Sequence, residues 1–413
     1  MSNFRIYIYL KIKYFCLSFF SGNNLRISKI FSILNQITNK KETILTSQLR
    51  VGFLLVLKFL IKKYPKKKEI IVNSYNLPEM INICKNLKLQ IVYSKLNENI
   101  FLSEKDLKKK INKNTLAIVT TNMFNTTSDI MKIQRVCKKK NIPLIEDNAI
   151  YFGNYISKGN KKIYSGSFGD FSLHSFNIMK NISAMYGGSV SSDDKKFIAY
   201  AKEEMSKFKK FSIFKYFKQC FVFIILKFLS INIFYKIFFF DLIRLAHKKN
   251  NKIILNLVYP SLQFKKKFIL ENYYKNISSF SVNMIFYQLN DKISLDLNHK
   301  IRKENNIYYS KKFKQKKIKS LKFIEIKEQN FQNFNDFPII VKNKKLLLHH
   351  LFSKGIETKD IQYVDCHKIF TGKNIKQLDN FENKILCLPN HVKISQKYID
   401  YIVNCIDMFY KNH

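Results

Sequence analysis

Tryptophan is absent from the 413 residues, and glycine and proline are scarce. Ten glycines and six prolines exclude collagen-like and linker-rich chains. The cysteines are scattered and form no C-x-x-C pair, which argues against a disulfide framework or a structural zinc site. They are Cys16, Cys84, Cys137, Cys220, Cys366, Cys387 and Cys405. This usage favours a reducing compartment, so we expect a cytoplasmic protein.

Arginine is also rare, although the net charge is +44. Only six of the 73 basic residues are arginine, and 67 are lysine. Nucleic-acid recognition relies on the planar arginine fork, so we do not predict a nucleic-acid partner. The lysines accompany many Asn, Ile, Phe and Tyr, a bias typical of A/T-rich codons. Such a charge still favours anionic substrates and anionic membranes.

What the chain does contain is an alternation of strands and helices over its first half. Apolar, β-branched runs predict strands at 42–47, 69–75, 89–96, 115–124 and 142–149. Helical spacing of apolar residues predicts helices at 49–64, 78–87, 105–113 and 130–141. This order is typical of βαβ units with a mostly parallel sheet. Ligands then bind at the carboxyl ends of the strands, where the sequence has Ser47, Ser74, Tyr75, Asn122, Glu146 and Asp147.

The second half has a different pattern. A long helix is predicted over 282–313, a strand over 337–342 and a final helix over 398–411. We therefore expect a lead segment at 1–39, a large α/β domain at 40–260, and a smaller C-terminal α/β domain at 261–413. No internal repeat is visible.

Two segments are unusually apolar. Residues 3–20 are interrupted by Lys11 and Lys13 and are too short and too charged to span a bilayer, so they pack or lie on a membrane surface. Residues 208–246 are dominated by Phe, Ile and Leu but include Lys227, Lys236 and Asp241. Three interpretations stay open for this segment: a helical hairpin buried on the large domain or a partner subunit, a helix lying in the membrane interface, and a membrane span.

The chemistry concentrates in residues 143–155 and 166–190. A strand brings Asp147 to the sheet edge, and a later Gly- and Ser-rich segment brings Ser175 and Lys180, followed by a Gly187-Gly188 turn. An acid at one strand end and a lysine at another form the layout that pyridoxal 5′-phosphate (PLP) requires. Its aldehyde needs an amine, its pyridine nitrogen needs a carboxylate, and its phosphate needs hydroxyls and backbone N–H groups.

The order of these residues resembles the DegT/DnrJ/EryC1/StrS family of sugar aminotransferases. The chain has Glu146-Asp147-Asn148-Ala149, then Phe152-Gly153, Gly166 with Gly169-Asp170, Ser175-Phe176 with Lys180, and Gly187-Gly188-Ser189-Val190. Weaker matches extend over roughly 40–410. They include Asn122 where a His is usual, Arg302 and Tyr308 in the long helix, and the segments GIETKD and LPNHVKIS.

The resemblance implies a PLP enzyme of fold type I, as in aspartate aminotransferase. Lys180 would form the Schiff base and move the proton, Asp147 would hold the protonated pyridine nitrogen, and Ser175 would bind the phosphate. The family's active sites are shared between two subunits, so a homodimer is implied. The amino donor implied is glutamate, and the acceptor is a nucleotide-linked keto-sugar.

The chain departs from the family pattern at several points. Where the family has S-G-T, this chain has Thr46-Ser47-Gln48-Leu49-Arg50, so Ser47 with Arg50 would bind the phosphate, although Arg50 is equally suited to helix packing. The Gln expected three residues after the Asp is Ile150. Tyr75, or else Leu77, would stack on the ring. Asn276, or else Lys275, would replace the phosphate ligands that the partner subunit lends.

Four functions were compared on these observations. The sequence favours an aminotransferase that acts on a nucleotide-linked keto-sugar for surface polysaccharide or lipopolysaccharide synthesis. The departures motivate a catalytically degenerate PLP-binding or regulatory protein of the same fold, peripheral on the inner face of the membrane through 208–246. Sugar deoxygenation is disfavoured because Lys180 is present, and a nucleic-acid binder is disfavoured by the lack of arginine.

Overall fold

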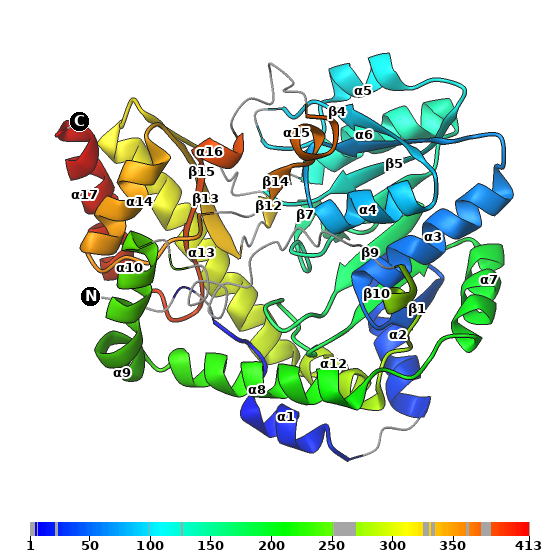
Figure 1. Ribbon diagram of the computed structural model, residues 1–413, viewed down its shortest axis with the longest axis horizontal. Coiled ribbons are helices and arrows are strands. Elements are labelled where there is room, and N and C mark those ends of the chain that lie inside the picture. Colours follow the sequence, from blue (N-terminus) through cyan, green and yellow to red (C-terminus); the bar gives the residue numbers. More distant parts are fainter. Residues whose placement is uncertain are drawn as a thin grey trace.

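The structure is a computed structural model of the whole chain. It describes residues 5, 7–20, 24–97, 99–124, 127–249, 251, 270–324, 330–331, 335–360, 363–372 and 381–412. Figure 1 shows two layered regions side by side: a large sheet flanked by helices, and a smaller sheet that packs against the C-terminal helices.

A seven-stranded sheet forms the centre of the larger region, with the order β1-β10-β9-β6-β5-β2-β4. Its strands are β1 (Glu42–Thr46), β2 (Glu69–Asn73), β4 (Gln90–Ser94), β5 (Thr115–Thr121), β6 (Leu144–Asp147), β9 (Phe171–Ser175) and β10 (Gly188–Ser192). All neighbouring pairs from β4 to β9 are parallel, whereas β10 is antiparallel to both β9 and β1. The expectation of a mostly parallel sheet is therefore confirmed.

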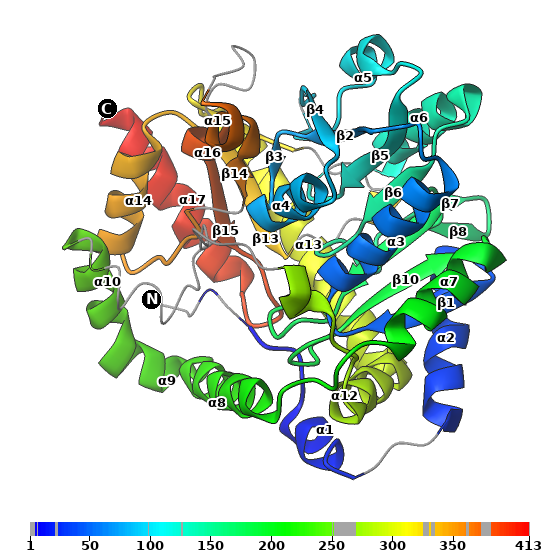
Figure 2. The same cartoon turned by 45° about the vertical axis from the view of Figure 1, so that its right-hand side comes forward.

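Helices cover both faces of this sheet because its strands are apolar on both sides. Neighbouring residues of β2 belong to different cores: Ile70 and Val72 pack with α3 and α4, while Ile71 packs with α5 and α6. The helices of this region are α2 (Asn24–Thr38), α3 (Leu49–Lys63), α4 (Pro78–Asn86), α5 (Glu104–Lys110), α6 (Thr127–Lys140) and α7 (Lys195–Ser206). Figure 2 shows α3 and α7 in front of the sheet and α6 behind it.

The smaller region is built on an antiparallel sheet of order β11-β13-β15. Its strands are β11 (Leu321–Phe323), β13 (Asp336–Val341) and β15 (Ile385–Pro389), and its helices are α13 (Lys292–Lys316), α14 (Lys344–Ser353), α15 (Cys366–Thr371), α16 (Phe381–Lys384) and α17 (Gln396–Lys411). Two short pairings link it to the large region. One joins β14 (Val364–Asp365) to β3 (Tyr75–Asn76), and the other joins β12 (Asn330–Phe331) to β7 (Tyr155–Lys158), which also pairs with β8 (Lys161–Tyr164).

The single long helix expected over 282–313 is wrong in one respect, because two helices occupy this stretch. The helix α12 (Ser279–Asn290) ends at Asp291, and α13 begins immediately after it. Asp291 caps α13 by accepting from the Ser294 amide at 3.3 Å. Its carboxylate also accepts from Lys11 Nζ at 2.7 Å and from the Tyr14 hydroxyl at 2.6 Å. The break is therefore stabilised by the N-terminal segment.

The described part of that N-terminal segment packs rather than standing free. Ile8 and Leu10 are fully buried, and a short helix, α1 (Ile12–Leu17), follows them. The Arg5 amide donates to Glu357 Oε2 at 3.0 Å. Phe15 contacts Phe223, with ring centroids 4.8 Å apart. The segment thus ties the smaller region to α1 and α8.

The apolar stretch 208–246 forms a chain of helices along the outer edge of the molecule (Figures 1 and 2). They are α8 (Ile213–Leu229), α9 (Asn232–Phe234), a π-helix η1 (Tyr235–Phe239) and α10 (Phe240–Lys248). One face of α8 is buried and the other is exposed to solvent. Within the described residues, no helix has the length and apolarity needed to cross a bilayer.

Candidate active site

Three of the predicted site residues lie at one edge of the central sheet. Gly188 is the register partner of both Thr46 on β1 and Ser175 on β9. Ser47 directly follows Thr46, so it lies at the same edge of the sheet as Ser175, with β10 between their strands. Asp147 ends β6, two strands from Gly188, and is 1% exposed. The carboxyl edge of the sheet therefore gathers Ser47, Ser175 and Asp147, as the sequence predicts.

Lys180 lies in the loop between β9 and β10, and this loop is closely tied to its surroundings. Its ends meet where the Phe176 amide donates to the Gly187 carbonyl at 2.9 Å. The side chain of Gln288 on α12 bonds Ser183 twice, accepting from its amide at 3.0 Å and donating to its carbonyl at 2.8 Å. Ile182 and Met185 are buried. The loop therefore holds Lys180 in a defined position.

Lys180 and Asp147 interact electrostatically. The pKa of Lys180 is lowered to about 8, chiefly by burial and also by the charges of Lys359 and Arg50, while Asp147 and Asp336 oppose the change. Burial raises the pKa of Asp147 to about 6, against the effects of the Ala149 amide and of Lys180. The Ala149 amide donates to Asp147 Oδ1 at 2.9 Å. The site thus combines an amine that is readily deprotonated with a buried carboxylate, and both are typical of catalytic positions.

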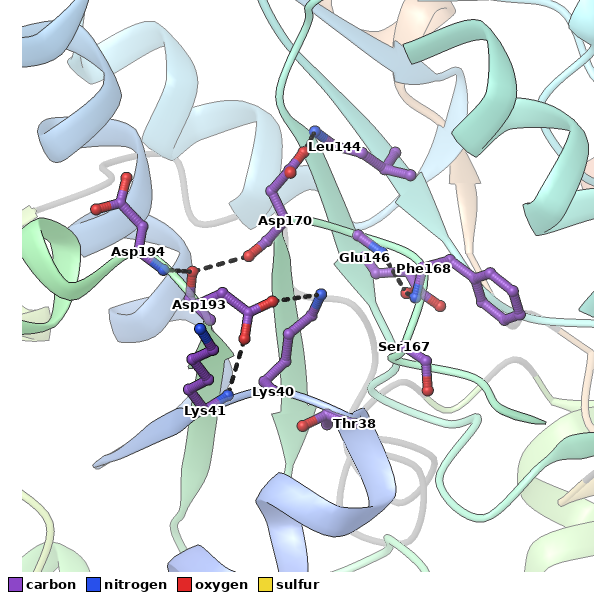
Figure 3. Close-up of polar contacts among 12 residues, drawn as sticks. Thr38, Lys40, Lys41, Leu144, Glu146, Ser167, Phe168, Asp170, Asp193 and Asp194 are labelled. Atoms are coloured by element: carbon purple, nitrogen blue, oxygen red, sulfur yellow. Dashed lines mark hydrogen bonds and ion pairs between the residues drawn. The ribbon is translucent and has the colours of Figure 1, made fainter. Parts of the chain in front are cut away.

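Glu146, next to Asp147, is a fully buried carboxylate with a structural role. It accepts from the backbone amides of Gly166 at 2.8 Å, Phe168 at 3.0 Å and Gly169 at 2.9 Å. Figure 3 shows the bond from the Phe168 amide to Glu146. Near it lies Asp170, which accepts from the Leu144 amide at 2.8 Å. The same view shows Asp193 accepting from the Lys41 amide at 2.9 Å. These carboxylates fix the turn before β9 and the ends of neighbouring strands.

Asn122, which follows β5, extends this buried network. Its amide group donates to Asn148 Oδ1 at 2.7 Å, Glu146 Oε1 at 3.1 Å and Ser165 Oγ at 3.2 Å. Its own Oδ1 atom is buried and has no hydrogen-bond partner among the residues that the structure describes. Asn148 directly follows Asp147, so the network supports the strand end that presents the Asp147 carboxylate.

The first turn of α3 lies against the end of β10. A β-carbon on Gly188 would stand 2.4 Å from the Leu49 backbone nitrogen. Only glycine therefore lets β10 pass so close to this helix end. Gln48, the N-cap residue, makes no capping hydrogen bond with its side chain. The amino end of a helix attracts anions, and here it adjoins Ser47 and Ser175.

Arg50, in the same turn, has partners outside the sheet edge. Its guanidinium donates to Glu79 Oε1 on α4 at 3.1 Å and lies 5.7 Å from the Tyr273 ring. Its charge still lowers the pKa of Lys180. Arg50 therefore takes part in helix packing and also lies within electrostatic range of the lysine.

Two further predicted residues have mainly structural contacts. Tyr75 is 3% exposed, and its hydroxyl accepts from the Tyr363 amide at 3.2 Å, which joins β3 to the smaller region. Its alternative, Leu77, is half-buried at the start of α4. Asn276 donates to the carbonyls of Met205 at 3.1 Å and Phe208 at 3.2 Å. Its alternative, Lys275, lies 6.0 Å from the Phe211 ring. These contacts do not bring Tyr75 or Asn276 to Lys180.

Sequence reasoning missed the residues that the smaller region contributes. Lys359 and Asp336, 3.6 Å apart, both affect the pKa of Lys180. Arg302 on α13 is 1% exposed and donates to Asn181 Oδ1, beside Lys180, at 2.6 Å. Arg302 matched the family pattern, but no local signal in the sequence reveals its contact with Asn181.

The residues present fit PLP. Burial disfavours the charged form of the Asp147 carboxylate. A cationic pyridine ring beside it would offset this cost, so Asp147 suits the ring of PLP. A lysine with a lowered pKa suits an aldehyde, since the neutral amine is the nucleophile. The helix end with its two serines suits a phosphate. All three chemical requirements of the cofactor are met at one edge of the sheet.

Sequence comparisons agree with this arrangement. Residues 32–222 match the model of the DegT/DnrJ/EryC1/StrS aminotransferase family. Over 126 residues the chain is 31% identical to GDP-perosamine synthase of Vibrio cholerae. The match covers 30% of this chain and 33% of that protein. Over 99 residues it is 37% identical to GDP-perosamine synthase of Escherichia coli O157:H7. This match covers 24% of this chain and 26% of that protein. The chain thus matches a third or less of the length of these curated relatives.

Structural comparison extends the likeness to the whole chain. Helicobacter pylori PseC, an aminotransferase involved in the biosynthesis of pseudoaminic acid, superposes with a TM-score of 0.74 and 16% identity over 100% of both chains. DesI, determined with its TDP-sugar product, gives a TM-score of 0.70 and 12% identity over 99% and 94% of the two chains. The fold is that of the fold type I sugar aminotransferases. The stretch 32–222, which matches the DegT/DnrJ/EryC1/StrS aminotransferase family model, includes the E-D-x-A strand, the lysine loop and the double glycine, so this part of the chain is similar to that family.

Proposed function

We propose that this protein is a PLP-dependent aminotransferase that converts a nucleotide-linked keto-sugar to an amino-sugar, with glutamate as the amino donor. The observation that supports it best is the electrostatic pairing of Lys180 and Asp147 at the carboxyl edge of the sheet. PLP, when bound, supplies an aldehyde that takes up the amino group and a ring that withdraws electrons from the reacting carbon.

Lys180 would have two roles: it would hold the cofactor, and it would transfer protons. Its pKa of about 8 leaves a substantial neutral fraction near physiological pH. The neutral Nζ would hold the cofactor through its aldehyde, and the same Nζ would serve as the base and acid that moves the proton during amino transfer. The loop would hold Nζ in one place for both roles, because Gln288 fixes the backbone of Ser183, three residues after Lys180.

Asp147 keeps the pyridine nitrogen protonated. Its carboxylate is buried, so its attraction for a cationic N–H group is little screened by water. Glu146 and Asn148 hold its strand end, which limits the movement of the carboxylate. Ser47, Ser175 and the first turn of α3 bind the phosphate, and Arg50 adds positive charge.

The substrate class follows from the chemistry of the relatives and from the charge of this chain. The curated relatives are named for GDP- and UDP-linked amino-sugars. A net charge of +44 favours an anionic nucleotide diphosphate. The product would supply surface polysaccharide or lipopolysaccharide synthesis. The protein would act as a homodimer in the cytoplasm, a location that agrees with its seven free cysteines.

The test begins with the purified protein and its Lys180→Ala variant, each mixed with PLP and then treated with borohydride. Peptide mapping should find the reduced cofactor on Lys180 and no attachment in the variant. Addition of L-glutamate before borohydride should convert the wild-type cofactor to its amino form and release 2-oxoglutarate. Wild-type protein that never attaches PLP, or that attaches it elsewhere, would overturn the proposal.

A second function is favoured by two departures from the family pattern. Ile150 replaces the Gln near Asp147, and Thr46-Ser47-Gln48 replaces S-G-T. On these grounds the alternative is a catalytically degenerate PLP-binding or regulatory protein. It predicts PLP on Lys180 with no glutamate-dependent release of 2-oxoglutarate, so the same experiment separates the two functions.

A further inference from the structure

The exposed side of α8 is a continuous apolar stripe. Phe214, Phe217, Phe221, Ile224 and Phe228 recur at alternating intervals of three and four residues, so they share one face of the helix. Their exposed fractions are 83, 63, 64, 55 and 45%. We call these five residues the α8 face. Exposed phenylalanines in such a row are uncommon on a soluble surface and mark an interaction site.

The opposite side of α8 anchors the helix to the fold. Tyr216, Phe223, Leu226 and Leu229 are buried, and Phe223 packs on Phe15 of α1. The Tyr216 hydroxyl is hydrogen-bonded to Ser281 on α12. The α8 face is thus presented by a helix that is fixed at its back, and its exposure follows from the fold.

Apolar exposure continues beyond α8 along the outer edge of the molecule. The exposed side chains that follow are Ile231, Ile233, Ile237, Phe238, Leu242 and Leu245. In Figures 1 and 2, α8 occupies the lower edge, with α1 beside it. On and just after α1, Ile12, Phe19 and Phe20 are more than 60% exposed.

The charged residues of α8 itself are all lysines. No carboxylate occurs between Glu204 and Asp241, and none before Glu42. Lys215 and Lys218 are exposed on α8 itself, and the nearby Lys275 together with burial lowers the pKa of Lys215. Closely spaced like charges are stabilised by an anionic partner.

From these features we propose that the α8 face docks on an anionic phospholipid membrane. The helix lies flat in the interface, its phenylalanines enter the acyl boundary, and its lysines contact lipid phosphates. A second copy of the chain suits the face less well, because a symmetric pairing would oppose two lysine-rich surfaces with no carboxylate on either α8.

Vesicle sedimentation of the full-length protein tests the proposal. At moderate salt the protein should bind vesicles of phosphatidylcholine with phosphatidylglycerol at least about tenfold more tightly than vesicles of phosphatidylcholine alone. Raising the salt concentration should weaken the binding. Failure to bind the anionic vesicles at moderate salt would overturn the proposal.

A matched pair of variants locates the binding surface. Phe217→Glu with Phe221→Glu places two charges on the α8 face and should reduce anionic-vesicle binding by at least about tenfold. Ile369→Glu with Met408→Glu makes the same change at exposed positions on α15 and α17, and should bind as the wild type does. Wild-type binding by the α8 pair would contradict the proposal. If vesicles are ignored and the α8 pair instead dissociates a dimer, the face binds a second copy and the membrane proposal is wrong.

The lack of tryptophan in the chain provides a second readout that does not depend on a disruptive change. Phe217→Trp introduces a single fluorophore on the α8 face, and Ile369→Trp introduces one on α15. With anionic vesicles, emission of the first should shift to the blue and be quenched by brominated lipid, while the second stays unchanged. Equal behaviour of the two reporters would overturn the proposal.

Charge reversal tests the electrostatic part. Lys215→Glu with Lys218→Glu should reduce binding at low salt several-fold, since each cation near an anionic surface contributes to affinity. Lys138→Glu with Lys139→Glu, exposed on α6, changes the net charge equally and should have a much smaller effect. Equal losses in both variants would mean that the overall charge, rather than the α8 surface, drives binding.

Discussion

The guanidinium of Arg302 donates a 2.6 Å hydrogen bond to the side chain of Asn181, the residue next to Lys180. It also donates to Asn335 and lies 5.1 Å from the Tyr9 ring. Arg302 is 1% exposed, and among the described residues it forms no salt bridge. This long-range bond makes Arg302 a positioning residue for the lysine loop.

We predict that Arg302→Met destabilises the fold by about 2–4 kcal/mol, because the buried amide oxygen of Asn181 and the half-buried one of Asn335 lose their donor. PLP attachment to Lys180 should slow as well, since Asn181 loses its support. Arg135→Met, exposed on α6, serves as the control and should change neither property. Urea unfolding and the rate of attachment measure the two effects. Unchanged attachment in a folded Arg302→Met protein would remove Arg302 from the positioning role.

Gly188→Ala should weaken both the fold and the phosphate site. The new β-carbon would overlap the Leu49 backbone nitrogen at 2.4 Å, so the first turn of α3 must shift, at a cost of about 1–3 kcal/mol. We expect at least a tenfold loss of PLP affinity in a titration. Gly159→Ala has open space around its β-carbon and should bind PLP normally despite its positive φ. Normal affinity in Gly188→Ala would show that this turn does not hold the phosphate.

PLP attachment should depend on pH through the ionisation of Lys180. Only the neutral amine reacts, so the rate should rise with pH and level off above about 8, the pKa of Lys180. In Asp147→Asn the negative charge that favours the ammonium form is lost, and the midpoint should move to lower pH. Stopped-flow absorbance measures both profiles. A midpoint near the ordinary lysine value of about 10.4 would contradict the expected environment of Lys180.

The stability of the cofactor-free protein should reveal the buried charge of Asp147. Its pKa is raised to about 6 in the folded state, from about 3.9 when unfolded, so the folded state binds the proton more tightly. Its contribution to stability is therefore complete below about pH 4 and is lost as pH rises through about 6.

The side chain in Asp147→Asn cannot ionise. The free energy of unfolding of the variant, relative to the wild type, should therefore rise by about 2–3 kcal/mol between pH 4 and pH 7. Chemical denaturation at the two pH values measures this gain. Saturating PLP should reduce it, because the cationic ring would stabilise the wild-type carboxylate. A pH-independent difference between the two proteins would refute a raised pKa at Asp147.

Glu146→Gln should be more damaging than its conservative chemistry suggests. One oxygen that accepts backbone N–H bonds becomes an amide that donates, and it then opposes the donors of Gly166, Phe168 or Gly169. We expect a loss of about 2–4 kcal/mol. Glu203→Gln, at an exposed position on α7, should be neutral in the same thermal unfolding assay. A loss no larger than that of the control would mean that Glu146 is bound as the protonated acid.

The sequence is informative where the interactions are local. The strands β2, β5 and β6 follow from short β-branched runs, and the positions of Asp147 and Ser175 at strand ends follow from the βαβ pattern. The break at Asp291 was missed because the apolar spacing continues through it, and the groups that stabilise it, Lys11 and Tyr14, are 280 and 277 residues away.

The same reason explains which site residues were missed. Arg302 meets Asn181 across 121 residues of sequence, and Lys359 and Asp336 approach Lys180 only when the smaller region packs on the larger one. Tyr75 and Asn276 were assigned from their neighbours in sequence. Their observed bonds, to Tyr363 and to the carbonyls of Met205 and Phe208, depend on tertiary pairings that no local pattern encodes.

The bond between Tyr216 and Ser281 has a consequence for anyone who shortens this protein. Ser281 donates its proton to the Ala184 carbonyl at 2.8 Å, so Tyr216 must donate to Ser281. Ala184 lies in the loop that holds Lys180, and a relay of two hydroxyls therefore joins that loop to α8. A shortened protein that joined α7 directly to α12 would lack Tyr216, so the Ser281 hydroxyl would lose the donor that orients it toward the lysine loop.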